Sequence, residues 1–346
     1  MARSAYLVLE NGKVFEGRFF GAEGEITGEI VFTTGMTGYL ETLSDPGCYG
    51  QIILQTFPLI GNYGVISPDF ESDNINARAY IVREACELPS NFRCEGSLDA
   101  YFKEKGIIGM CGIDTRSLTR ITRENGVMNG KITMSPPTEA DISEAKKYVI
   151  ETPIAKVSTK TITKTGDGSR RIALMDFGCK RGIVNALTSR DCTVWSFPYD
   201  TPVEEIMKTD PQGIILSNGP GNPADPGNAV IIDTLKELMK TDVTMFGICI
   251  GHQLLARANG YETKKMKLGH RGTNQPVQDL STGRVYITSQ SHGYEVIAGG
   301  SFVNDNDGTN EGLDYGKSFS VQFRPDACAG PLDTEFLFEQ FMERMS

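Results

Sequence analysis

A cysteine between two glycines is the residue whose type and spacing most directly suggest chemistry in this sequence. An apolar run from Thr244 breaks at Gly247-Ile248-Cys249-Ile250-Gly251, and the chain then continues with helical spacing to Gly260. A strand, a tight turn and a helix are therefore predicted, the arrangement of a nucleophile elbow with Cys in place of the usual Ser. The positive end of the helix would favour the thiolate, so Cys249 is the predicted nucleophile. The alternative is a small buried side chain, as most free cysteines are.

A second segment strengthens the catalytic interpretation. Ser217-Asn218-Gly219-Pro220-Gly221 follows the apolar run Gly213-Ile214-Ile215-Leu216, so it is expected at the carboxyl end of a strand, where open α/β sheets place their sites. The Gly-Pro-Gly turn leaves backbone N–H groups unobstructed, which suits an oxyanion hole. Together the two segments favour a nucleophilic Cys249 over a merely buried one.

Both segments, with Gln290-Ser291-His292-Gly293-Tyr294, resemble the class I glutamine amidotransferases. The segment Val31 to Tyr39 resembles one branch of them in particular, the small subunits of carbamoyl-phosphate synthase. The resemblance covers nearly the whole chain. It implies a glutamine-hydrolysing subunit with a flavodoxin-like catalytic domain.

The resemblance also assigns roles to individual residues. It implies that Cys249 attacks the glutamine amide and that the backbone N–H groups of Ile250 and Gly221 stabilise the oxyanion. Two positions depart from the family, since Ser291 stands where it has Asn and Gly47 where it has Ser. The positions implied to bind glutamine are Gly47, Gly219, Gly221, Ile250, Gln253, Ser291, Gly293 and Tyr294.

The largest departure from the family lies at Arg324-Pro325-Asp326. The family reads His-Pro-Glu there, with the histidine as general base and acid and the glutamate as its orienter. Arg324 cannot give up its proton at ordinary pH, so it cannot act as the shuttle, although its charge could hold Cys249 as thiolate. We therefore expect impaired glutamine hydrolysis. Of the three histidines, His292 is the candidate to replace the shuttle, the alternative being that it shapes the pocket.

Regular alternation marks the elements that must position these residues. Between 171 and 346, apolar runs typical of buried strands alternate with helical spacing, and the chain ends in an amphipathic helix from Asp333 to Met345. This pattern predicts an α/β domain with a doubly wound parallel sheet. Residues 151–170 are polar, rich in Thr, Lys and Gly, and are predicted to be a linker.

The first 150 residues mix strands and helices without regular alternation, which predicts a β-rich α+β domain. A hairpin is expected around Asn11-Gly12 with a primed turn, and an ordered loop over residues 35–49. A helix opening at Asp114 or Thr115 carries Arg116, Arg120 and Arg123. Such a basic face is usually only solvated, but it could meet an acidic partner surface. By resemblance, this half docks the partner.

Composition limits the remaining possibilities. The 346 residues carry a net charge of −10, which argues against nucleic acid or an anionic membrane as partner. The eight cysteines form no C-x-x-C pair and there are three histidines, so no metal site is predicted. The N-terminus lacks the apolar segment of a signal peptide. Free thiols and a cytoplasmic location are expected.

The resemblance implies a small subunit of carbamoyl-phosphate synthase that passes ammonia through a tunnel to a large synthetase subunit, for pyrimidine and arginine synthesis. ATP and magnesium are expected in that partner, and no cofactor in this chain. A non-catalytic scaffold of an ammonia-dependent synthase is the first alternative, favoured by Arg324-Pro325-Asp326. A stand-alone hydrolase or another amidotransferase subunit is the second, and the first 150 residues weigh against it.

Overall fold

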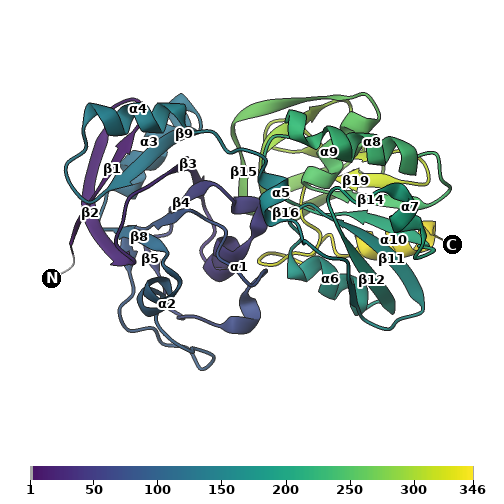
Figure 1. The fold of residues 1–346 in the computed structure, drawn as a ribbon, viewed down its shortest axis with the longest axis horizontal. Helices are drawn as coiled ribbons and strands as arrows, with labels where there is room; N and C mark the ends of the chain where they lie inside the picture. The colour runs from purple at the N-terminus through teal and green to yellow at the C-terminus, as the bar shows by residue number, and fades with distance from the viewer. Residues whose placement is uncertain (1–2, 346) are drawn as a thin grey trace. The chain divides into compact units, whose positions relative to one another are not determined.

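The structure is a computed structural model that describes residues 3–345. The chain forms two compact units, the first ending at Glu151 and the second beginning at Thr152 (Figure 1). Each unit has its own hydrophobic clusters. Within the described range, no helix has the length and apolar character needed to cross a membrane.

The first unit is built on a closed barrel. Around the barrel the strands are β1 (Ser4–Leu9), β2 (Val14–Gly21), β8 (Ile108–Cys111), β6 (Ala79–Ile81), β4 (Gln51–Gln55), β3 (Ile26–Thr33) and β9 (Met128–Thr133). Pairings β3–β4, β4–β6 and β6–β8 are parallel and the others antiparallel. Side chains alternate between the two faces of a strand, so Ile52 and Leu54 of β4 enter one hydrophobic cluster and Ile53 enters another.

Short elements complete the first unit. They are α1 (Tyr39–Ser44), α2 (Leu98–Lys105), α3 (Thr115–Asn125), α4 (Glu139–Lys147), the two-stranded sheet of β5 (Leu59–Ile60) and β7 (Glu84–Ala85), and the 3₁₀ turns η1 (Pro46–Cys48) and η2 (Ser67–Asp69). The side chains of Ser97 and Asp114 cap α2 and α3 by accepting hydrogen bonds from the backbone N–H groups of Ala100 and Ser117. The β-rich α+β prediction is confirmed.

Two local expectations are corrected. Residues 35–49 contain α1 and η1 rather than a loop, because Tyr39, Leu40 and Leu43 are buried and a helical turn brings them to one side. The first hairpin does not close with a two-residue primed turn of type I′ or II′. Gly12 alone in the turn has positive φ, and Leu9 N donates to Lys13 O at 2.9 Å, so the loop has three residues.

The second unit contains a ten-stranded sheet. Its parallel part has the order β12 (Cys192–Pro198), β11 (Arg170–Asp176), β13 (Gly213–Leu216), β14 (Thr244–Ile248) and β19 (Phe319–Val321). Numbered along the chain this is 2-1-3-4-5, the flavodoxin-like order. Beyond β19 follow the antiparallel strands β18 (Asn310–Asp314), β17 (Phe302–Asn304), β15 (Glu262–Asp279) and β16 (Val285–Ile297).

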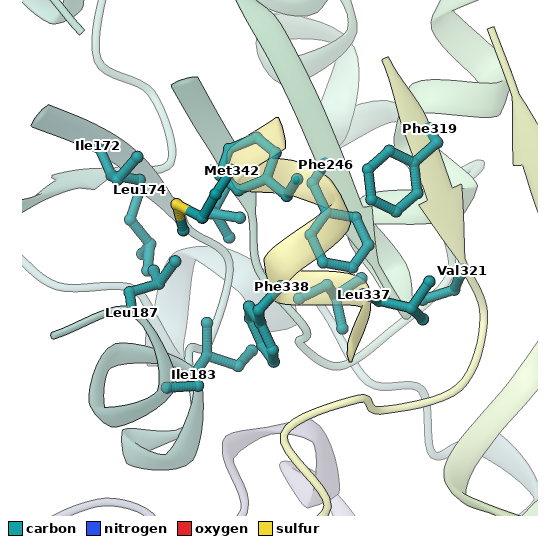
Figure 2. Close-up of a cluster of buried hydrophobic side chains, with 14 of the residues drawn as sticks. Ile172, Leu174, Ile183, Leu187, Phe246, Phe319, Val321, Leu337, Phe338 and Met342 are labelled. Atoms are coloured by element: carbon teal, nitrogen blue, oxygen red, sulfur yellow. The ribbon is translucent and has the colours of Figure 1, made fainter. Parts of the chain in front are cut away.

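Helices cover both faces of this sheet. The helices are α5 (Pro153–Val157), α6 (Arg181–Thr188), α7 (Val203–Met207), α8 (Ala229–Leu238), α9 (Ile250–Ala258) and α10 (Phe336–Arg344), with a 3₁₀ turn η3 (Pro226–Asn228). Figure 2 shows one face, where Ile183 and Leu187 of α6 and Phe338 of α10 pack with Phe246 of β14. The opposite cluster takes residues of α5, α7, α8 and α9. The doubly wound prediction is confirmed.

The segment 151–170, for which the sequence predicts a linker, contains α5 and the edge strand β10 (Thr163–Thr165). All three residues of β10 are exposed, so the segment shows no apolar period. The segment is held in place by two contacts with the second unit. Strand β10 pairs antiparallel with β12, and Ile154 of α5 is buried among residues of the second unit.

Candidate active site

Cys249 lies at a sharp turn between β14 and α9. Its φ of 57° and ψ of −110° are far from the usual regions for a residue other than glycine, and such strain is held only where the surroundings fix it. The Cys249 N–H donates to Val321 O of β19 at 2.9 Å, and Gln253 N donates to Cys249 O at 3.2 Å. Neighbouring strand and helix together hold the thiol at the helix N-terminus, as the sequence predicts.

The two glycines beside Cys249 are required by packing. A Cβ on Gly247 would lie 2.9 Å from Gly251 O, and one on Gly251 would lie 2.2 Å from Leu216 O of β13. Contacts this short to backbone atoms cannot be relieved by a side-chain rotation. The Gly-x-Cys-x-Gly spacing therefore lets α9 cross closely over β13 and β14.

The Gly-Pro-Gly segment follows β13, directly beside the elbow strand β14. Gly251 N donates to Ser217 O at 3.2 Å, and Ser217 Oγ accepts from Phe177 N at 2.9 Å, so this loop is tied to the elbow helix and to the end of β11. Gly221 has φ of 102°, and a Cβ there would meet Pro153 Cγ at 2.3 Å. A Cβ on Gly219 would meet Phe177 O at 2.0 Å. The predicted oxyanion segment and the thiol thus share one edge of the sheet.

Gln253 lies one turn along α9 from the thiol and is 2% exposed. Its Nε2 donates to Tyr294 O and to Gln322 Oε1, both at 2.8 Å. A backbone carbonyl can only accept, so the amide orientation is fixed and its two donor hydrogens are used. Oε1 remains the atom through which Gln253 can contact a substrate. Gly293 and Tyr294 lie on the same stretch of β16 as Ser291.

Arg324 follows β19 and is held beside β16. Its backbone N donates to Ser289 O at 2.9 Å, and its Nη2 lies 3.4 Å from Ser291 O. The Sγ of Cys249 lies 3.9 Å from that same oxygen. Arg324 is 4% exposed. The structure therefore places a buried guanidinium next to the predicted nucleophile, in the position where the resembled family has its histidine.

Asp326 pairs with a lysine that sequence reasoning missed. Lys180, directly before α6, places its Nζ 2.6 Å from Asp326 Oδ2, with side-chain exposures of 1% and 0%. The same Nζ donates to Cys328 O, and Lys180 N donates to Asn218 Oδ1 at 3.0 Å. The sequence signal for Lys180 was its charge, because it comes shortly after β11, whose central residues are apolar. Asp326 thus neutralises a buried ammonium and orients no imidazole.

None of the three histidines hydrogen-bonds to Cys249. His292 lies 2.9 Å from Tyr294 O through Nδ1 and 2.8 Å from Gln290 Oε1 through Nε2, and burial holds its pKa well below the ordinary value. His252 Nδ1 lies 2.8 Å from Ser320 Oγ, and burial lowers its pKa to about 3. A neutral imidazole carries one N–H, which either of these two oxygens can accept, so the ring is held by β16 itself. His292 is therefore a shaping residue in this geometry rather than a substitute proton carrier.

His270 belongs to a buried polar cluster. Burial lowers its pKa, but hydrogen bonds with Glu311 and Asp307, at 3.1 and 2.9 Å, outweigh this and raise it. The ligand atoms of His270, His292 and Glu311 lie within 4.8 Å of one another, so these three could hold a metal ion. Gln290 Oε1 lies 3.0 Å from His270 Nδ1 and 2.8 Å from His292 Nε2, so hydrogen bonds already join the two rings through this amide.

Gly47 is the one predicted glutamine-binding residue outside the second unit. It lies in η1, where its N–H donates to Asp45 Oδ1 at 2.8 Å. The remaining predicted site residues are brought together by the carboxyl ends of β13, β14 and β19, the start of α9, and β16.

An elbow cysteine on a flavodoxin-like sheet, beside a Gly-Pro-Gly loop, defines a class I glutamine amidotransferase domain, and residues 173–344 match the family model described as glutamine amidotransferase class-I. Residues 7–132 match the model of the carbamoyl-phosphate synthase small chain, CPSase domain. The chain belongs to the carbamoyl phosphate synthase small chain family.

Relatives over the whole length agree. A carbamoyl phosphate synthase small chain of Clostridium perfringens is 46% identical over 98% of this chain and 99% of its own length. One of Bacillus cereus is 49% identical over 97% of this chain and 94% of its own. A pyrimidine-specific small chain of Halalkalibacterium halodurans is 45% identical over 98% of this chain and 96% of its own.

Proposed function

We propose that this chain serves carbamoyl phosphate synthesis together with a large synthetase chain, and that its own hydrolysis of glutamine is slow. The family and the names of its relatives support the first part, one of them being called pyrimidine-specific. ATP and magnesium act in the large chain, and this chain needs no cofactor. A reducing cytoplasm suits its eight free cysteines.

The chemistry assigned to the site follows from the residues at the elbow. The Cys249 sulfur attacks the amide carbon of glutamine, and the N–H groups of Ile250 and Gly221 stabilise the resulting oxyanion. Gln253 Oε1 accepts a hydrogen bond from the substrate. The amine then leaves as ammonia once it gains a proton, and water releases glutamate from the thioester.

The proton for the leaving ammonia is the deficient step. A histidine would deliver it and then activate the water, but Arg324 has donors only and stays charged. The observation that supports slow hydrolysis is that all three histidines are hydrogen-bonded elsewhere. Losing a general acid and base typically slows a reaction by about 10²- to 10⁴-fold.

The test compares two nitrogen sources in the complex with the large chain. Carbamoyl phosphate formation should proceed with ammonia and be very slow with glutamine. Brisk glutamine-dependent synthesis would refute slow hydrolysis. Failure of the two chains to associate, or no synthesis from ammonia, would refute the role in the synthase.

A second candidate, a non-catalytic scaffold for an ammonia-dependent synthase, is favoured by the burial of Arg324 and by the Lys180–Asp326 pair. The two candidates differ in the residual glutaminase. Slow hydrolysis that disappears in Cys249→Ala supports the enzyme. Hydrolysis that is absent, or unchanged by Cys249→Ala, supports the scaffold.

A further inference from the structure

Three strands of the second unit bring two imidazoles and a carboxylate together. His270 lies on β15, His292 on β16 and Glu311 on β18, and all three are buried. Their ligand atoms lie within 4.8 Å of one another. We call these three residues the histidine–glutamate cluster. Because each of them comes from a different strand, the cluster has no short spacing by which the sequence could predict a metal site.

The outer nitrogen of each ring is held by a neighbouring oxygen. His270 Nε2 lies 2.9 Å from Asp307 Oδ2, and His292 Nδ1 lies 2.9 Å from Tyr294 O. Metal-binding histidines are typically oriented in this way, by a carboxylate or a backbone carbonyl on the ring nitrogen that does not bind the metal. The inner nitrogens, His270 Nδ1 and His292 Nε2, both face the amide oxygen of Gln290.

The amide of Gln290 leaves a ring nitrogen without a proton for its neighbour. Thr288 Oγ1 donates to Gln275 O at 2.9 Å, so it must accept from Gln290 Nε2 at 3.1 Å, and Gln290 Oε1 is thereby turned toward the rings. His292 then has an uncharged oxygen beside each ring nitrogen. In this buried setting the ring stays neutral, with one N–H. One nitrogen lone pair therefore faces an oxygen lone pair, a contact that a cation bound to both atoms makes favourable.

Glu311 adds a negative charge that hydrogen bonds satisfy only in part. Its Oε1 lies 3.1 Å from His270 Nδ1 and 3.2 Å from Asn304 Nδ2, which is also 3.3 Å from His270 Nδ1. Within residues 3–345, Glu311 Oε2 is buried and has no hydrogen-bond partner. Leaving a buried carboxylate oxygen unpaired is costly, and a bound ion is one way to satisfy it. Glu311 and Asp307 together carry the charge that balances a divalent cation.

We propose that the histidine–glutamate cluster binds a divalent transition-metal ion, best matched by zinc, with Gln290 Oε1 as the fourth donor. Imidazole nitrogens suit zinc, whereas magnesium and calcium bind through oxygen. Donor atoms around a tetrahedral zinc ion lie roughly 3.4 Å apart. Three of the separations here are 2.8, 3.0 and 3.1 Å, so small side-chain shifts admit the ion. The side chain of Asp307 is 43% exposed and opens the cluster to solvent.

The ion acts as a structural clamp on the strand that carries predicted glutamine contacts. His292 directly follows Ser291, whose carbonyl oxygen lies beside both Cys249 Sγ and Arg324 Nη2. Coordination joins this stretch of β16 to β15 and β18. The ion takes no part in the thiol chemistry, so the inference goes beyond the proposed function and does not depend on it.

The test adds Zn²⁺ to the full-length chain after chelator treatment and measures affinity by competition with a chromogenic chelator. One ion should bind per chain, and saturating Zn²⁺ should raise the melting temperature. His270→Gln and Glu311→Gln each remove a ligand and should weaken binding by at least about 100-fold. Asp307→Asn changes only the outer contact of His270 and should cost about 10- to 100-fold. Thermal melting of each variant without metal checks folding.

Two controls separate this site from the eight free cysteines. His252→Gln changes a buried histidine that lies outside the cluster, and Cys249→Ala removes the active-site thiol. Both variants should bind Zn²⁺ like the wild type. Co²⁺ in place of Zn²⁺ should give the visible absorption of nitrogen and oxygen ligands, without the near-ultraviolet band of a cobalt–thiolate bond. The wild-type spectrum tests the ligand set without any substitution.

Three results would overturn the inference: no binding of Zn²⁺ at micromolar concentration, equal affinity in the wild type and in both ligand variants, or a cobalt spectrum with thiolate ligands. The first result would leave a proton on His270 as the partner of the Glu311 charge. The second would place the ion outside the cluster, and the third would assign it to cysteines. The role of the chain in the synthase is tested separately, by association and by synthesis from ammonia.

Discussion

The thiol of Cys249 and the guanidinium of Arg324 contact the same atom, the carbonyl oxygen of Ser291, at 3.9 and 3.4 Å. The two groups act on the sulfur in opposite ways. A carbonyl oxygen accepts a hydrogen bond from the thiol and so favours the neutral form of the sulfur. A nearby permanent cation favours the thiolate. Arg324 is thus suited to hold a charge beside the nucleophile and unable to move a proton.

Restoring the family's acid–base pair should restore hydrolysis. The double change Arg324→His with Asp326→Glu is expected to raise glutaminase by at least about two orders of magnitude, because the imidazole can protonate the leaving ammonia. The rate is measured as glutamate release. The same double change combined with Cys249→Ala is the control and should abolish the gain. An unchanged rate in the double variant would place the deficiency elsewhere.

Removing the charge alone should act on the thiol. Arg324→Gln keeps a planar donor but loses the cation, so alkylation of Cys249 by iodoacetamide at neutral pH should slow by about an order of magnitude or less. Peptide mapping follows each cysteine separately. Cys328 is exposed and serves as the internal reference for alkylation. In the wild type it should be alkylated before Cys249, which is 2% exposed. Equal Cys249 rates in both proteins would show that Arg324 does not influence the sulfur.

Breaking the buried Lys180–Asp326 pair should be costly. Lys180→Met removes the cation paired with the buried Asp326 carboxylate, and Asp326→Asn removes a carboxylate paired with the buried Lys180 ammonium. Each should therefore lower the free energy of unfolding of the second unit by about 3–5 kcal/mol. The double change Lys180→Met with Asp326→Asn removes both charges and should cost less than the sum. Urea denaturation of the four proteins gives the coupling energy. Strict additivity would mean that the two side chains stabilise the fold independently.

Two histidines should show opposite pH dependence. The pKa of His252 is lowered to about 3 by burial, so the unfolded chain binds its proton first and stability falls as pH drops below about 6.5, by up to about 1.4 kcal/mol per pH unit. His252→Gln should remove this loss of stability at acid pH.

The pKa of His270 is raised, so its contribution to the free energy of unfolding is present below about pH 6.5 and is lost as pH rises through the folded pKa. His270→Gln should therefore destabilise at low pH and little at high pH. Parallel stability–pH curves for both variants and the wild type would contradict these assignments.

The sequence predicts best where structure is local. Gly213–Leu216 and Thr244–Ile248 are continuous apolar runs because parallel strands are covered on both faces, and Gly-x-Cys-x-Gly marks the elbow because both glycines are needed sterically. The strand β15 has no such signal. It is largely polar, and its pairing with β16 and β17 determines its conformation.

The parts of the candidate site that sequence reasoning missed depend on distant contacts. Lys180 has no local motif, and its burial is explained by Asp326, 146 residues later. The parallel barrel strands β6 and β8 have only three and four residues, and their register is set by pairing with each other and with β4, far apart along the chain. The departure at Arg324 could be read from the sequence, but the placement of the His292 ring between Tyr294 O and Gln290 Oε1 could not.

The closure of the first unit's barrel determines how a neighbouring molecule can be recognised there. A sheet closed on itself has no unpaired backbone edge, so no polypeptide can join the barrel by strand addition. Recognition at the barrel must therefore use side chains and the loops at the strand ends. The charge of an exposed side chain there can be reversed by a single substitution without disturbing the fold. The open sheet of the second unit differs, and its β10 edge is limited to three exposed residues, one of them Lys164, a short charged edge of the kind that discourages unwanted pairing.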